Sequence, residues 1–342
     1  DCETDFDRWL LSIYFRKIAD KTGYIYRAVS QCTDLSKSEL FSHIATLIFD
    51  EPNKEAFISD RLAAMKLAAE KGVQIPDMAR TKLKAKLTSI AIAPEQGGYY
   101  LATRLLTPLT DEELQLAIRW VAQGNVNIND IKSIFPDFYS YLQPLNLNYL
   151  EAANQWILEY FDYYRISKIS DTINERVSEI MSEKNANSTS FLNWYNNFRT
   201  VKTILHNRSD IDILYWIDGL GVDWIPFIRN IIDKFEKEHV YLNEIHIAVA
   251  DLPTITAINK PILQSLLPDN CPLKRIGDLD SFAHSAKKYP QYIIGEMRIL
   301  EKAITQVLDK YTGKKIAFVS DHGVTYLAQH SNGLKLAGLN PN

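Results

Sequence analysis

Apolar residues recur at helical spacing through about the first two hundred positions, and long strand-like alternation is absent there. Amphipathic helices are expected at five places in this half: around residues 9–18, 40–48, 54–71, 110–124 and 149–164. The helix at 110–124 has the clearest boundaries, because Thr110 can cap its start and Gly124 can end it. This half of the chain is therefore predicted to be entirely helical.

After Leu205 the pattern changes to short apolar runs rich in β-branched residues, separated by helical stretches. Strands are expected at residues 211–217, 244–250 and 315–320, with helices at about 224–235 and 289–311. Strands that alternate with helices are typical of a mainly parallel sheet. The sequence thus predicts an α + α/β fold, with a helical N-terminal domain at residues 1–204 and an α/β domain at residues 205–342.

Composition changes this picture little. The 342 residues are 46% apolar and 23% charged, which is typical of a globular protein with more than one domain. The formal charge of -4 excludes a positive field over the whole protein that would attract nucleic acid. The basic run at residues 80–86 could contact nucleic acid locally, but the interpretation as a solvent-exposed face is favoured. Three cysteines without metal-type spacing, and no apolar run of membrane length, predict a cytoplasmic protein without a membrane partner.

Polar residues follow each predicted strand. Asp218 ends the first, a loop leading to Thr256 follows the second, and Asp321 and His322 follow the third. Because ligands of parallel sheets bind beyond the carboxyl ends of the strands, we expect these side chains to converge at one edge. Carboxylates and an imidazole suit a divalent cation, Zn²⁺ first and Mn²⁺ or Mg²⁺ as alternatives. Metal coordination can also turn a hydroxyl such as that of Thr256 into a nucleophile.

Asp280 and His284 form a second candidate pair. If this stretch opens a helix, the i,i+4 spacing places both side chains on one face, where they could hold another cation. The prediction is thus of up to two ions.

Each candidate also has a plain structural interpretation. Asp218 could start a tight turn, and Asp321 with His322 could form a polar turn. Thr256 could be a helix N-cap, and His284 a solvated histidine. For each residue taken alone, this structural alternative stays open. The joint occurrence of these candidate residues in this order favours a common site. His246 lies in an apolar run and is expected to be a packed or hydrogen-bonded core residue.

The segments IDGLG, ADLPTITAINK, DLDSFAH and VSDHG resemble the PglZ domain, a branch of the alkaline phosphatase superfamily found in bacterial phage-exclusion (BREX) defence systems. The resemblance runs from about residue 205 to the end, and the helical half is similar to the region that precedes that domain. It implies an alkaline-phosphatase-like α/β domain in which Asp218, Thr256, Asp321 and His322 share one metal.

The resemblance also assigns roles. Thr256 would be the nucleophile, because the Pro-Thr-x-Thr spacing looks like that of the phosphodiesterase relatives, in which the second threonine attacks. Asp280 and His284 would hold the second metal, and the role of Asn259 stays open. The implied function is a metal-dependent phosphodiesterase or phosphatase in antiviral defence, acting on a phosphate ester or nucleotide beside other phage-defence proteins. The alternative is a catalytically weak or inactive scaffold subunit of a BREX complex.

The chain departs from the superfamily pattern at its end. The superfamily usually supplies a further histidine to the second metal from well beyond the Asp-His-Gly motif, and His330 is the sole histidine after Gly323. The sequence also predicts only three strands, which is few for a doubly wound sheet. Both shortages predict an α/β domain that is incomplete at its C-terminus.

Overall fold

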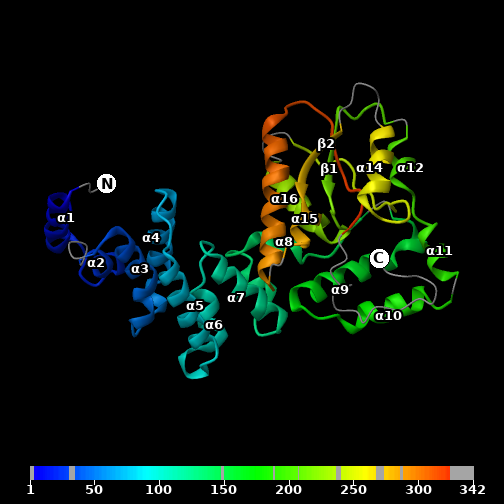
Figure 1. Ribbon diagram of the computed structural model, residues 1–342. Coiled ribbons are helices and arrows are strands. Elements are labelled where there is room, and N and C mark those ends of the chain that lie inside the picture. The colour runs from blue at the N-terminus through cyan, green and yellow to red at the C-terminus, as the bar shows by residue number, and fades with distance from the viewer. Residues whose placement is uncertain are drawn as a thin grey trace. The chain divides into compact units, whose positions relative to one another are not determined.

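The computed structural model describes residues 4–30, 35–147, 150–187, 189–206, 208–235, 240–266, 273–285 and 288–323. By its internal contacts the chain forms two compact units, Asp1–Phe135 and Pro136–Asn342. Figure 1 shows helices in the first unit and helices around a small sheet in the second.

In the described part of the first unit all regular secondary structure is helical, as the sequence predicts. Its elements are α1 (Asp5–Ile18), α2 (Tyr24–Val29), α3 (Lys37–Thr46), η1 (Leu47–Asp50), η2 (Glu55–Phe57), α4 (Ile58–Glu70), α5 (Asp77–Ala91), η3 (Pro94–Gln96), α6 (Gly98–Arg104), α7 (Asp111–Ala122) and η4 (Ile128–Ile131). The predicted cap of α7 is confirmed, since the Thr110 side chain accepts a hydrogen bond from the Glu113 backbone N–H at 3.2 Å.

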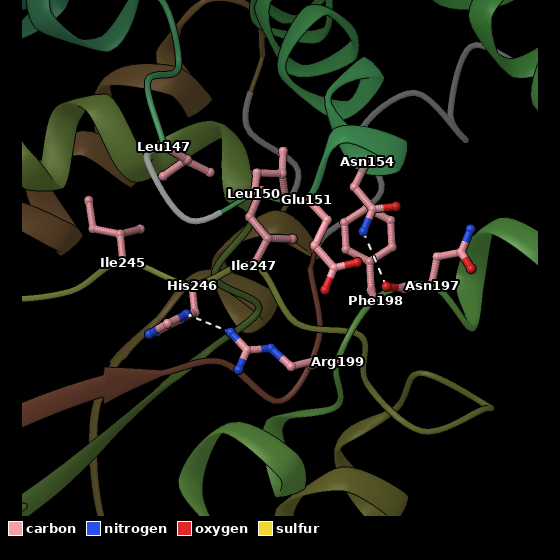
Figure 2. Close-up of a pocket in the computed structure, with 10 residues that line it drawn as sticks. All are labelled: Leu147, Leu150, Glu151, Asn154, Asn197, Phe198, Arg199, Ile245, His246 and Ile247. Carbon is pink, nitrogen blue, oxygen red and sulfur yellow. Dashed lines mark hydrogen bonds between the residues drawn. The ribbon is translucent and has the colours of Figure 1, made fainter.

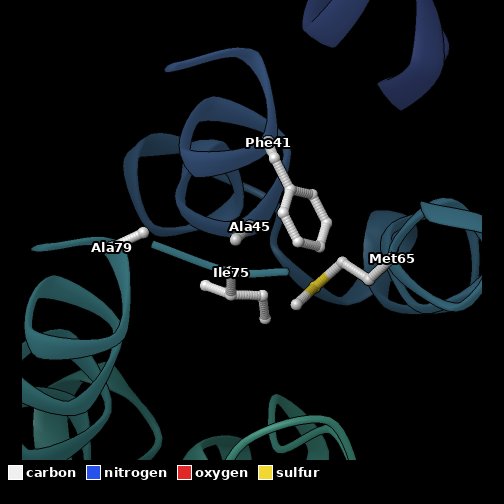
Figure 3. Close-up of a cluster of buried hydrophobic side chains, with 5 residues drawn as sticks. All are labelled: Phe41, Ala45, Met65, Ile75 and Ala79. Carbon is white, nitrogen blue, oxygen red and sulfur yellow. The ribbon is translucent and has the colours of Figure 1, made fainter. Parts of the chain in front are cut away.

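A core cluster joins three helices of this unit. Phe41 and Ala45 of α3 pack with Met65 of α4, with Ala79 of α5 and with Ile75, which lies just before α5 (Figure 3). All five side chains are buried, so the apolar residues that predicted α3 and α4 also hold these helices against α5, which the sequence analysis did not predict.

The first helix differs from expectation in its packing. The stripe of Trp9, Leu10, Tyr14 and Ile18 does form a helix, but each of these side chains is at least half exposed. Ser12 is the buried residue of α1. The stripe therefore predicted the helix correctly, but periodicity does not show whether a partner surface exists for its apolar face.

The second unit contains both helices and strands. Its elements are α8 (Pro136–Tyr141), η5 (Ala152–Asn154), α9 (Trp156–Ser170), α10 (Glu175–Lys184), α11 (Ser190–Tyr195), α12 (Val201–Leu205), β1 (Ile213–Asp218), η6 (Val222–Trp224), α13 (Ile225–Lys234), α14 (Thr256–Ser265), β2 (Leu273–Asp278), α15 (Leu279–Ala283), α16 (Gln291–Lys310) and β3 (Ile316–Val319). The change from helices to strands comes near residue 205, as predicted, while α8 to α12 belong to the same compact unit as the sheet.

Three parallel strands form the sheet, in the order β2-β1-β3. All six residues of the central β1 are buried. Figure 1 shows α16 on one side of the sheet and α14 with α12 on the other. Two of the three predicted strands are confirmed, and the α + α/β class agrees with this mostly helical chain and its parallel sheet.

The predicted strand at residues 244–250 is wrong. Among the described residues this run pairs only through one isolated bridge, between Thr200 and Val249. The strand β2 takes the place beside β1 instead, although only two of its six residues, Leu273 and Ile276, are large apolar ones. Pairing with a buried neighbour, rather than apolar content, decided which segment became a strand.

A buried charge network ties the helices of the second unit to the segment that follows β1. Lys168 of α9 lies 3.2 Å from an oxygen of Asp223 in η6 and 2.5 Å from one of Glu296 in α16. Tyr141 of α8 donates a hydrogen bond to Asp223 at 3.3 Å. Burial raises the pKa of Glu296. Burial lowers the pKa of Lys168, but the charges of Asp223 and Glu296 raise it more, so the net shift is upward. The network thus joins α8, α9 and α16 to η6, which follows the turn at Asp218.

Candidate metal centre

The parallel pairing of β1 and β3 brings two carboxylates to one edge of the sheet. Ile213 pairs with Ile316 and Trp216 with Val319, and the same register continued by two residues places Asp218 beside Asp321. Asp218 is the last residue of β1, and Asp321 follows the end of β3. The expected convergence at the carboxyl ends of the strands is therefore present.

His322 completes a group of three ligand residues. Its Nε2 lies 3.5 Å from Oδ1 of Asp218 and 3.6 Å from Oδ2 of Asp321. One ligand atom from each of the three residues lies within 4.8 Å of the other two. Two carboxylate oxygens and one imidazole nitrogen at these separations can hold a divalent cation.

The burial of the two carboxylates supports a cation between them. Asp218 is 5% exposed and Asp321 only 1% exposed. Oδ2 of Asp321 is buried and has no hydrogen-bond partner among the described residues, and Oδ1 lies 3.5 Å from the backbone N–H of Gly219. An unpaired buried carboxylate oxygen is costly, and a positive ion removes that cost.

Thr256 presents its hydroxyl to the same group. It is the first residue of α14, and its Oγ1 lies 3.1 Å from Nε2 of His322 and 3.4 Å from Oδ1 of Asp218. The N-cap position belongs to Ile255, so the interpretation of Thr256 as an N-cap is wrong. Its side chain makes no capping bond and points to the ligand residues instead.

Asn259 holds the segment that presents Thr256. Its Oδ1 accepts a hydrogen bond from the backbone N–H of Asp251 at 2.8 Å, and its Nδ2 donates to the carbonyl of Asp251 at 3.0 Å and to that of Ile255 at 3.2 Å. Asn259 is buried, so these bonds are shielded from water. The sequence left the role of Asn259 open, and in this structure Asn259 positions the segment that carries Thr256.

Electrostatics at the group favour a positive partner. Burial raises the pKa of the Asp218 carboxyl, and the nearby charge of Asp321 raises it further, while Arg275 acts in the opposite direction. Nη2 of Arg275 donates to Oδ2 of Asp218 at 2.7 Å and to Oδ2 of Asp278 at 2.5 Å. Sequence analysis missed Arg275, because its place beside Asp218 depends on β2, a strand whose pattern of apolar residues is weak.

The second predicted pair lies outside this group. Asp280 belongs to α15 and His284 is its C-cap, so the spacing does bring them together, with Oδ1 and Nε2 3.6 Å apart. The His284 side chain is 80% exposed, and the group of three described ligand residues includes neither member of the pair. His330, the further histidine considered from the sequence, lies outside the described residues.

A hollow borders the ligand group. Its lining includes Asp321 and Ser320 from the end of β3, Asp251 and Asn259 from the segment around Thr256, and Lys202 of α12. The buried carboxylate of Asp321 therefore forms part of the wall of this hollow.

A different pocket surrounds His246 (Figure 2). His246 is hydrogen-bonded, as one of the two predicted alternatives has it: its Nε2 lies 2.8 Å from Oε2 of Glu244 and its Nδ1 3.4 Å from Nη2 of Arg199. It is only partly buried, so its predicted place in the core is wrong. Asn154 also lines this pocket and donates from Nδ2 to the carbonyl of Asn197 at 3.2 Å. None of the candidate metal ligands lines it.

The basic run at residues 80–86 has acidic partners at two of its positions. Arg80 pairs with Asp77 and with Glu112, and Lys86 lies 3.5 Å from Asp50. These contacts support the interpretation of this run as a solvated face.

Among the residues that the structure describes, no helix has the length and apolar character needed to cross a bilayer. Comparison with known proteins adds no family: no family model, no curated protein and no solved structure matches the chain. The geometry of Asp218, Thr256, Asp321 and His322 is therefore the basis for any statement about function.

Proposed function

We propose that this protein is a metal-dependent phosphoesterase in which Thr256 is the nucleophile. The observation that carries the proposal is the meeting of a hydroxyl, an imidazole and two buried carboxylates that come from three separate segments of the chain. Such a set fits a divalent cation and a nucleophile beside it. Zn²⁺ suits these nitrogen and oxygen ligands, and Mn²⁺ or Mg²⁺ are alternatives.

The ligands of the cation would be Asp218, Asp321 and His322. When bound, a divalent cation would favour the ionised form of a neighbouring hydroxyl and offset the negative charge of a phosphate group. Since Nε2 of His322 would be a ligand, the proton of Thr256 would pass to solvent rather than to this imidazole.

The covalent step would take place on Thr256. Its Oγ would form a bond to phosphorus while the bond from phosphorus to the leaving oxygen breaks, and the leaving group would take that electron pair and a proton from water. Water would then attack the phosphothreonine and release inorganic phosphate or a phosphate monoester. Asn259 would keep Oγ in place through its bonds to Asp251 and Ile255.

The resemblance of the four motifs to the PglZ domain extends the proposal to biology. It supports an alkaline-phosphatase-like domain, a phosphodiester or nucleotide substrate, and a cytoplasmic role in BREX phage defence beside other proteins of that system. A second metal at Asp280 and His284, which the resemblance implies, belongs to the same proposal.

A specific observation favours the second candidate, a scaffold subunit with little or no catalysis. His284 is largely exposed and stands outside the group of three ligand residues, so the described part of the chain offers one compact metal group. A scaffold would bind partner proteins without needing Thr256.

Hydrolysis of bis(p-nitrophenyl) phosphate by the metal-loaded protein separates these candidates. We expect turnover in the wild type and in Thr256→Ser, which keeps a hydroxyl, and none in Thr256→Val, which keeps the shape but not the hydroxyl. Metal content, measured by elemental analysis, should be similar in all three proteins. Turnover that persists in Thr256→Val would contradict the proposed nucleophile, and absence of both metal and turnover would favour the scaffold.

A further inference from the structure

We propose that Trp216, Lys260 and Arg275 form a subsite for a second phosphate group, next to the phosphate that Thr256 attacks. This inference rests on the proposed phosphoesterase function and narrows its substrate class. The substrate would be an ester that carries two or more linked phosphates, as nucleoside diphosphates and triphosphates do.

Two cations meet at one indole. Nζ of Lys260, on α14, lies 5.0 Å from the centre of the Trp216 ring, and Cζ of Arg275, on β2, lies 5.1 Å from it. Both distances are within the range of cation–π attraction. The indole of the central strand thus contacts two positive groups that come from different elements.

Hydrogen-bond donors around this indole outnumber their acceptors. Within the described residues, Lys260 makes no hydrogen bond or ion pair, and Arg275 uses Nη2 alone, for Asp218 and Asp278. The indole N–H of Trp216 is buried and has no acceptor, in a residue that is only 3% exposed. A buried donor without an acceptor is costly, and an anion oxygen would satisfy the indole N–H while the partly exposed Lys260 and Arg275 supply positive charge.

The position of these donors suggests a neighbouring phosphate rather than the attacked one. Trp216 and Asp218 point to the same face of β1, and two strand residues span about 7 Å. Lys260 follows Thr256 by one helical turn, so both lie on one face of α14. Arg275 bridges the two places, since its Nη2 is bonded to Oδ2 of Asp218. The spacing along β1 exceeds the distance between two linked phosphorus atoms, so the long side chains of Lys260 and Arg275 would reach from Trp216 toward Asp218 to hold the next phosphate of the substrate.

The negative charges near the proposed subsite set a condition for the binding of an anion. Asp218 and Asp278 accept hydrogen bonds from Arg275, and Asp321 lies close to Asp218, so these carboxylates would repel an anion on their own. Binding of a diphosphate is therefore expected to require the divalent cation.

Calorimetric titration of the metal-loaded protein with pyrophosphate and with orthophosphate tests the subsite, at equal free Mn²⁺ concentration. We expect pyrophosphate to bind at least tenfold more tightly than orthophosphate to the wild type. Lys260→Gln should lose most of this preference, with less than a threefold change for orthophosphate. Lys302→Gln, the same charge change at an exposed position of α16, should keep the preference.

The subsite would be overturned if the wild type bound pyrophosphate and orthophosphate with equal affinity, or if Lys260→Gln kept the full preference for pyrophosphate. Turnover of bis(p-nitrophenyl) phosphate that depends on Thr256, without any pyrophosphate preference, would leave the phosphoesterase in place and remove the subsite alone. A preference that depends on Lys260, without such turnover, would support the anion site and contradict the enzyme. If neither is observed, both proposals fail.

Discussion

Oγ1 of Thr256 lies 3.1 Å from Nε2 of His322, although 66 positions separate the two residues. The first opens α14 and the second follows β3, so no local turn can produce this contact. Their meeting, with Asp218 and Asp321 beside them, is what turns scattered polar residues into a candidate metal centre.

Replacing Asp321 should abolish most metal binding. Asp321→Asn keeps the shape of the side chain but removes a charge that faces His322. At a Zn²⁺ concentration of about 100 times the dissociation constant, the wild type should gain about 2.7 kcal/mol of unfolding free energy, and Asp321→Asn should lose most of this gain. Thermal unfolding with and without Zn²⁺ measures the difference.

Asp280→Asn is the matched control for this experiment. Asp280 lies outside the group of three ligand residues, so stabilisation by the first ion should persist in this variant. If Asp321→Asn responds to Zn²⁺ as strongly as the wild type does, the ligand assignment is wrong.

The buried charge network of Lys168 predicts a large loss of stability when its cation is removed. Lys168→Met leaves the carboxylates of Asp223 and Glu296 buried without a cation, which typically costs about 3–5 kcal/mol. Glu296→Gln keeps the Lys168–Asp223 pair and should cost less. Urea unfolding followed by tryptophan fluorescence measures both, with Lys302→Met as an exposed control. Equal losses in Lys168→Met and Lys302→Met would show that the network is not structural.

Tyr311 should titrate near physiological pH. Hydrogen bonds from Lys274 and from Tyr215 lower its pKa to about 8, whereas burial raises the pKa of Tyr215 to about 12. The ordinary pKa is 10.0, so the folded state releases the proton of Tyr311 first. This contribution to stability is complete above pH 10 and is lost as the pH falls through about 8.

Absorbance at the tyrosinate band against pH checks this expectation. One tyrosine should ionise near pH 8 in the wild type, and Tyr311→Phe should remove that step. Lys274→Met should move the step towards the ordinary value, because the donor that stabilises the phenolate is gone. A step near pH 8 that survives Tyr311→Phe would assign it to another residue.

Gly295 leaves room for the ring of Phe282. A Cβ at Gly295 of α16 would overlap this ring, which belongs to α15. Gly295→Ala gains about 1 kcal/mol of helix propensity, but the overlap should cost about 1–3 kcal/mol, so we expect net destabilisation. In a Phe282→Leu background the overlap is relieved, and the same substitution should become stabilising. Unfolding free energies of the four proteins in this cycle decide the sign.

Much of the fold could be predicted from local pattern. The helix at α7 is marked by Thr110 and by its apolar stripe, and β1 and β3 are marked by short apolar runs that end in Asp218 and before Asp321. The convergence of these two acids follows from the parallel order of the strands. Periodicity and turn chemistry are properties of neighbouring residues, so the sequence alone can determine them.

Other features depended on contacts between distant segments. The run at 244–250 is apolar yet stays unpaired except at Val249, while the weakly apolar β2 joins the sheet and carries Arg275 to Asp218. Which segment pairs with β1 depends on the whole packing of the second unit, and no local pattern contains that information. By itself the sequence determined which ligand types stand at the strand ends, whereas only the tertiary structure decided which of them meet, because their contacts close loops of many residues.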